Sequence, residues 1–87
     1  MNLKTIEIKG IDGATKEVDF DYKGLANYIF NKTTDIGGLE VARELYKSGS
    51  IELNKENATL LKSYIKECFG AVVQEALFPV LNKEIDK

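Results

Sequence analysis

Side chains that commonly carry catalysis are scarce in this sequence. Histidine is absent from its 87 residues, which removes the commonest general base and the commonest neutral metal ligand. The single cysteine, Cys68, excludes an intrachain disulfide and any CxxC metal or redox site. Because Cys68 lies between Glu67 and Phe69 on an apolar stripe, we expect a buried structural thiol and not a nucleophile.

The other groups that could do chemistry lack the neighbours that the chemistry requires. Ser48, Ser50 and Ser63 have no activating base close in the sequence, so no nucleophilic apparatus is visible. Glu40 and Glu44 lie one helical turn apart, as pairs of carboxylate metal ligands do, but neither a histidine nor a second such pair accompanies them. A solvated helix face is the expected place of these two carboxylates.

Two adjacent glycines, Gly37 and Gly38, fall near the start of an expected helix, where backbone amides could cradle a phosphate. Neither a P-loop pattern nor GxGxxG is present, so the glycines are expected to allow a tight connector. We therefore predict that the protein is not an enzyme and that it has no catalytic, cofactor-binding or metal-binding residues.

The charge of the chain is acidic and dispersed. The net charge is −2 and the isoelectric point is about 5.1. The longest basic cluster is Lys62 and Lys66, one helical turn apart, whereas nucleic-acid-binding proteins usually show a basic face. Aromatic side chains could stack on bases only beside such a face, so we expect them in the core and at its rim. Nucleic acid is not the expected partner.

The sequence shows no targeting or membrane segment. No secretory leader follows Met1, and no apolar run approaches the ~18 residues of a membrane span. Together with the single cysteine, this predicts a reducing, cytoplasmic location and no membrane partner.

The elements that must position these side chains are organised around the C-terminal third of the chain. An apolar stripe with helical spacing runs through it, at Leu61, Ile65, Cys68, Val72 and Ala76. One unbroken helix over residues 55–84 would span about 45 Å. A globule with a radius of gyration of roughly 12 Å cannot cover that length. We therefore expect helices over residues 55–69 and 71–84, divided at Gly70, with a kink or restart near Pro79.

The N-terminal residues 3–21 alternate between apolar and polar side chains, which predicts a β-hairpin. A three-residue loop, Ile11 to Gly13, with Gly13 in the left-handed conformation, would set Ile6 opposite Val18. The outward face would then carry four acidic side chains: Glu7, Glu17, Asp19 and Asp21. They could form a cation site or a docking face for a basic partner. The preferred interpretation is a solvated face whose charges protect the sheet edge.

Between the hairpin and the C-terminal third, two shorter helices are expected over residues 22–31 and 36–47. Asp21 would cap the first helix, Thr34 or Asp35 the second, and Gly49 would supply a left-handed stop. The segment Ile51 to Leu53 has the length of one brief strand, which would complete a three-stranded sheet before Asn54 caps the next helix. The fold class is therefore α+β, with three to four helices in a single domain over residues 1–87. The expected inward side chains of the two shorter helices are Tyr22, Leu25, Ala26, Ile29, Phe30, Leu39, Ala42, Leu45 and Tyr46.

The middle of the chain resembles a group of known sequences. The stretch Leu25 to Leu53, LANYIFNKTTDIGGLEVARELYKSGSIEL, looks like small uncharacterised proteins carried by prophages and mobile elements of gut bacteria. This resemblance implies accessory biology of a phage or mobile element and carries over no functional residue.

We expect a non-catalytic protein-interaction module that pairs with itself as a homodimer through its C-terminal helices. Past Gly70, apolar groups occupy more than one side of a short helix, which is more exposed apolar surface than a monomer tolerates. The candidate interaction surface is Phe69, Val72, Val73, Ala76, Leu77, Phe78, Val80 and Leu81. The alternative is a nucleic-acid-binding regulator in which the helices over 22–31 and 36–47 act as a helix-turn-helix, although the segment from Ile36 to Glu40 offers almost no base readers.

Overall fold

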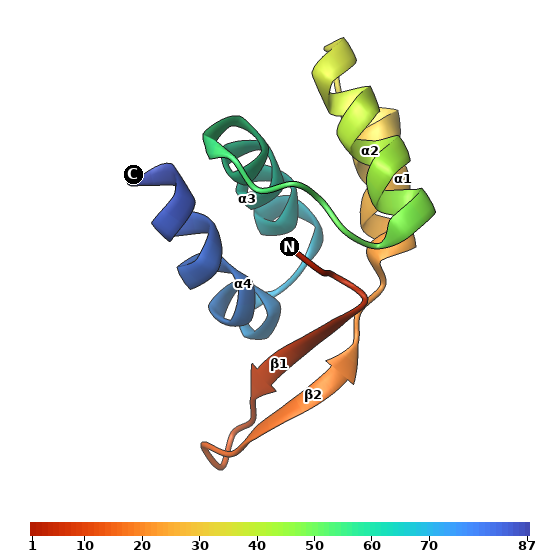
Figure 1. Ribbon diagram of the computed structural model, residues 1–87. Coiled ribbons are helices and arrows are strands. Elements are labelled where there is room, and N and C mark those ends of the chain that lie inside the picture. Colours follow the sequence, from red (N-terminus) through yellow and green to blue (C-terminus); the bar gives the residue numbers. More distant parts are fainter.

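A β-hairpin is followed by two helical hairpins in the computed structural model, which describes residues 1–87 (Figure 1). The elements in chain order are β1 (Thr5–Lys9), β2 (Thr15–Asp19), α1 (Tyr22–Lys32), α2 (Ile36–Ser48), α3 (Lys55–Cys68) and α4 (Ala71–Ile85). The predicted α+β class is confirmed, and each helix boundary lies within one residue of its predicted position. None of these helices combines the length and the apolar character needed to cross a membrane.

The hairpin has the predicted register. Ile6 lies opposite Val18 in the antiparallel pair, and Gly13 adopts a φ of 85°. Gly10 N donates to Ala14 O at 2.8 Å and closes the three-residue loop. This register holds because it keeps the apolar side chains of both strands on one face, where Ile6 is buried.

The predicted third strand is absent. Residues 51–53 form no strand, and the pairing with the N-terminal segment is a single bridge between Asn2 and Ser50. Leu3 N donates to Gly49 O at 2.7 Å beside that bridge. The Asn2 carboxamide accepts from Lys4 N at 2.9 Å, a local turn that separates the bridge from β1 and ends the pairing there.

The helix caps follow the sequence. Asp21, Asp35 and Asn54 each accept a hydrogen bond from the backbone N–H three residues later, at 2.9, 2.7 and 2.8 Å. Gly49, with a φ of 71°, ends α2 in the left-handed conformation that a residue with a Cβ avoids. Asp35, and not Thr34, is therefore the cap of α2.

The C-terminal third breaks where the length argument required. α3 ends at Cys68, Gly70 is extended, and α4 begins at Ala71. Of the expected kink or restart near Pro79, the restart is wrong, because α4 continues through that residue to Ile85, and the kink stays a prediction. Pro79 and Glu75 are both exposed, so water can reach the carbonyl that loses its hydrogen bond and no second interruption is needed.

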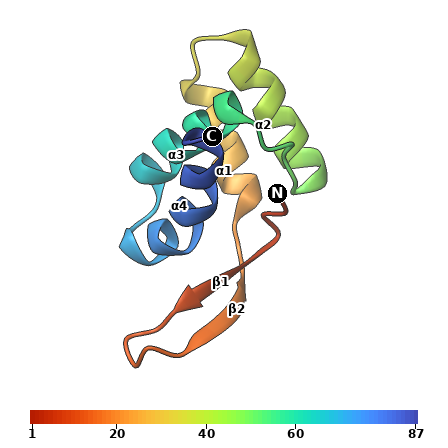
Figure 2. The same ribbon diagram turned by 60° about the vertical axis from the view of Figure 1, so that its left-hand side comes forward.

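The helix pairs α1–α2 and α3–α4 enclose the core, and the hairpin projects from one end (Figures 1 and 2). The radius of gyration is 12.6 Å, close to the value expected for this length. The largest fully buried side chains come from the N-terminal segment and all four helices: Leu3, Leu25, Ile29, Leu45, Leu61, Ile65 and Leu81.

Two side chains expected in the core lie at the surface. Phe30 is 45% exposed and Tyr46 is 48% exposed. Each directly follows a fully buried residue, Ile29 or Leu45, and successive helix positions are rotated by about 100°, so the narrow inward stripe excludes both rings. Val41 was not among the predicted inward side chains of the second helix, but it is buried.

Candidate functional site

A groove of about 600 Å³ separates the free edge of β1 from α4. In both views of the ribbon, α4 lies over β1 and away from β2 (Figures 1 and 2). Side chains and backbone from both elements line the groove, chiefly Thr5, Ile6, Glu7 and Lys9 from the strand and Glu75, Ala76, Leu77 and Val80 from the helix.

The hydrogen-bond pattern of the hairpin decides which β1 backbone groups face this groove. Phe20 N donates to Lys4 O at 3.0 Å, and Gly10 N donates to Ala14 O at 2.8 Å, so these two pairs are hydrogen-bonded ones. Hydrogen-bonded and non-hydrogen-bonded pairs alternate along an antiparallel ladder. The even-numbered residues of β1 therefore bond to β2.

The odd-numbered residues of β1 point their backbone groups the other way. Thr5, Glu7 and Lys9 form the non-hydrogen-bonded pairs with β2, and no hydrogen bond outside the hairpin involves their N–H or C=O groups. The free edge of β1 thus presents a row of unpaired donors and acceptors to the groove, as an edge strand does before another strand is added.

The helix contributes an apolar wall. Leu77 is 4% exposed and forms the floor, whereas Ala76 is half-buried and Val80 is 45% exposed along the side. Val80 shares a face with Leu77 and Ala76 because it lies three and four positions beyond them along α4. An extended segment entering the groove would cover this wall with alternate side chains.

The groove lining carries two carboxylates, Glu7 and Glu75, one cationic side chain, Lys9, and the ammonium of Met1. Glu7 lies directly opposite Glu17 in the sheet, an arrangement of like charges that costs stability. Glu17 itself does not line the groove, and Lys9 is the only cationic side chain that does. The chain's one ion pair joins Lys87 to Glu84, so none of these groups is neutralised by a salt bridge.

The eight residues of the predicted interaction surface do not form one surface. Leu77 and Leu81 are 4% and 0% exposed and belong to the protein's own core, which corrects their assignment to an interface. Phe69 packs on Phe20 with ring centroids 4.8 Å apart, so it closes the hairpin end of the core. Val73 is half-buried against the same core.

The remaining members divide between two sides of α4. Phe78 is half-buried beneath Lys62, whose Nζ lies 5.4 Å from the ring centroid. Ala76 and Val80 line the groove. Val72 is 51% exposed and lines no cavity. The groove therefore keeps two surface residues of the predicted set, together with strand residues that the apolar pattern could not identify.

Cys68 is exposed, contrary to the expectation of a buried thiol. It occupies the last residue of α3, beyond the stripe that Leu61 and Ile65 bury. Partial burial of the sulfur, followed by the nearby carboxylates of Asp21 and Glu67, raises the pKa of the thiol. A raised pKa keeps it protonated at neutral pH, which opposes a nucleophilic role.

Other candidate chemical groups remain isolated. No group of three or more cysteine, aspartate or glutamate side chains is placed to hold a metal ion. Glu40 and Glu44 line a shallow surface hollow. Gly38 is buried, and a Cβ there would collide with the Thr33 side chain, so this glycine allows the close approach of the connector to α2. The hydroxyl of Tyr28 donates to Glu67 Oε2 at 3.0 Å, which raises the pKa of Tyr28.

A second surface with exposed apolar groups lies on the outer side of α1 and α2. The guanidinium of Arg43 lies 5.7 Å from the ring centroid of Phe30, and Lys23 Nζ lies 5.4 Å from that of Tyr46. With Asn27, three of these residues line a hollow of about 270 Å³. The rings on this face are partnered by cations of the same chain.

Comparison with known proteins adds no family to this description. The chain matches no family model, no curated protein and no solved structure.

Proposed function

We propose that this protein is a non-catalytic interaction module that binds a protein segment in the groove between β1 and α4. The single observation that carries the proposal is the unpaired backbone edge of Thr5, Glu7 and Lys9 facing the apolar wall of Ala76 and Val80. Main-chain hydrogen bonds to such an edge supply affinity, and pockets for alternate side chains supply specificity.

This role accounts for features that have no use in an isolated monomer. The sheet has only two strands, and α4 covers one face of it chiefly at β1, so the free edge of β1 stays unpaired. Glu7 and Glu75 would favour a segment that brings a positive charge to each of them. The accessory phage or mobile-element setting implied by the sequence resemblance, and a cytoplasmic location, belong to the same proposal.

Site-specific photo-crosslinking in growing cells tests this function. A photoreactive residue at Val80, on the groove wall, is expected to give a discrete crosslinked protein band. The same residue at Lys55, exposed at the start of α3, is the matched control and is expected to give none. Absence of a discrete product at Val80, or an equal product at both positions, would contradict the proposed function.

A nucleic-acid-binding regulator is the second candidate. The observation in its favour is the face of α1 and α2 that carries Lys23, Arg43 and Lys47 beside two exposed rings. It ranks second because two of those cations already lie over rings of their own chain, and the net charge is −2.

A further inference from the structure

Resting on the proposed function, we propose that the segment bound in the groove is β1 of a second copy of this chain, paired antiparallel to give a continuous four-stranded sheet. The two copies of Ile8 lie opposite each other across the two-fold axis. The sheet order is then β2–β1–β1–β2, and both free β1 edges are removed.

The sequence of β1, Thr5-Ile6-Glu7-Ile8-Lys9, is self-complementary about Ile8. In the antiparallel pair centred there, Glu7 of each copy lies opposite Lys9 of the other, so the interface contains two opposite-charge pairs. Glu7 and Lys9 are also residues whose backbone groups point to the free edge. The two pairs therefore form at hydrogen-bonding positions and supply four main-chain hydrogen bonds.

Other registers are disfavoured by groups already placed in the monomer. Centring the pair on Glu7 would line up four glutamates across the sheet, because each Glu7 already faces a Glu17. Centring it on Ile6 would bring Leu3 opposite Lys9, yet Leu3 N already donates to Gly49 O at 2.7 Å. The register centred on Ile8 avoids both conflicts.

This register also places a cation beside the like-charged pair Glu7 and Glu17. Across the outer face of the four-stranded sheet, the row reads Glu17, Glu7, Lys9 of the second copy and Thr15 of the second copy. Lys9 of the second copy thus comes to lie beside Glu7 and Glu17, the two like charges that the monomer leaves opposed.

The helix-facing side is covered by the same arrangement. A two-fold axis perpendicular to the sheet keeps both α4 helices on one face, so the second hairpin enters the space beside Ala76 and Val80. Ile8 is half-buried in the monomer, and it meets its equivalent at a non-hydrogen-bonded position, where side chains approach most closely.

Charge reversal and its rescue test this dimer by sedimentation equilibrium. The wild-type chain is expected to sediment as a dimer at high micromolar concentration. Glu7→Lys and Lys9→Glu alone each convert two attractive pairs into repulsive ones and are expected to weaken dimerisation about tenfold or more. The double variant restores the two attractive pairs and is expected to return within a few-fold of wild type.

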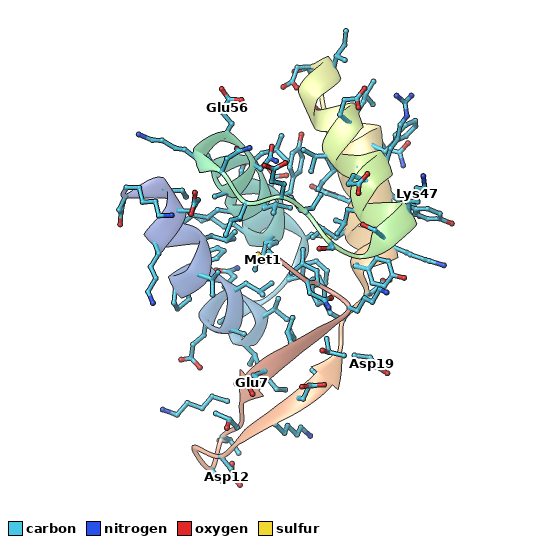
Figure 3. The ribbon with its side chains drawn as sticks, in the orientation of Figure 1. Met1, Glu7, Asp12, Asp19, Lys47 and Glu56 are labelled. Carbon is cyan, nitrogen blue, oxygen red and sulfur yellow. The ribbon has the colours of Figure 1, made fainter.

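The matched control reverses charges far from the groove. Lys55→Glu and Glu56→Lys make the same changes at the start of α3, and Glu56 lies at the opposite end of the molecule from Glu7 (Figure 3). These variants are expected to dimerise as wild type does. Circular dichroism melting of every variant separates loss of the dimer from loss of the fold.

Hydrogen exchange locates the interface. The backbone amides of Glu7 and Lys9 are expected to become more protected as protein concentration rises, while that of Glu17, on the outer edge of β2, is not. A wild-type monomer at several hundred micromolar, a double variant as weak as the single ones, or a dimer indifferent to all these changes would overturn the inference. A wild-type monomer that still gives a discrete heterologous crosslink at Val80 would leave the proposed function standing.

Discussion

Two surfaces of this protein leave large apolar side chains in water, and they differ in what surrounds those side chains. On the outer face of α1 and α2, Phe30 and Tyr46 lie under cations of the same chain, and the nearby backbone is paired within helices. Beside α4, Val80 faces a strand edge with unpaired backbone groups and unneutralised carboxylates.

The comparison shows that exposed apolar area alone does not identify an interface. About as much of the side chain is exposed at Phe30 as at Val80, 45% in each case. What distinguishes the groove is polar potential left unused by the monomer: main-chain donors and acceptors, and charges without partners. A second strand would pair with these groups. The face of α1 and α2 has no such groups, because its rings already lie beside cations of the same chain.

The largest expected effect separates the two sides of α4. Leu81→Ala removes a fully buried side chain and is expected to lower the free energy of unfolding by about 3 kcal/mol. Val80→Ala, at the adjacent but exposed position, is expected to change it by less than about 0.5 kcal/mol. Urea denaturation measures both, in the Glu7→Lys background so that dimerisation does not contribute.

Equal losses of unfolding free energy in Leu81→Ala and Val80→Ala would contradict the different roles assigned to these two residues. They would mean that the groove wall belongs to the core of the monomer and has no need of a partner. A much larger loss for Leu81→Ala would instead show that Leu81 stabilises the fold, whereas Val80 is available for binding.

Much of the fold was predictable because it depends on local chemistry. Caps at Asp21 and Asn54, the left-handed Gly49 and the turn at Gly13 each act within a few residues, so sequence spacing alone placed them. The same spacing left two candidates for the cap of α2, Thr34 and Asp35, and the structure selects Asp35. The break at Gly70 followed from comparing the helix length with the size of the globule.

The candidate site was only half predictable, because it depends on how distant elements meet. Periodicity placed Ala76 and Val80 on an apolar helix but could not separate them from Leu77 and Leu81, which turn inward. The contribution of β1 was missed because an unpaired edge has no sequence signal until the number of strands is known. The missing third strand created that edge, because the expected pairing is confined to the first three residues, around the bridge at Asn2.

A smaller effect tests whether the α1–α2 face is covered by its own chain. A double-mutant cycle between Phe30→Leu and Arg43→Gln is expected to give a coupling free energy of about 0.5 kcal/mol, as for an exposed cation over an aromatic ring. Thermal or urea denaturation of the four proteins measures it. The control cycle pairs Phe30→Leu with Lys47→Gln, which has no ring contact, and is expected to give none. A coupling near zero between Phe30 and Arg43 would remove the difference between the two surfaces.

The smallest expected effect is on nucleic-acid binding by that same face. Duplex affinity at physiological salt comes from releasing counterions at several clustered phosphate contacts. Here Arg43 and Lys23 lie over rings, the amide of Gly38 at the start of α2 already donates to Asp35, and Glu40 follows. We therefore expect fluorescence anisotropy to show no mid-nanomolar complex with duplex or single-stranded DNA, and Arg43→Glu to change nothing. A tight complex that weakens with added salt and disappears in Arg43→Glu would make this face the binding surface and reverse the ranking of the two candidate functions.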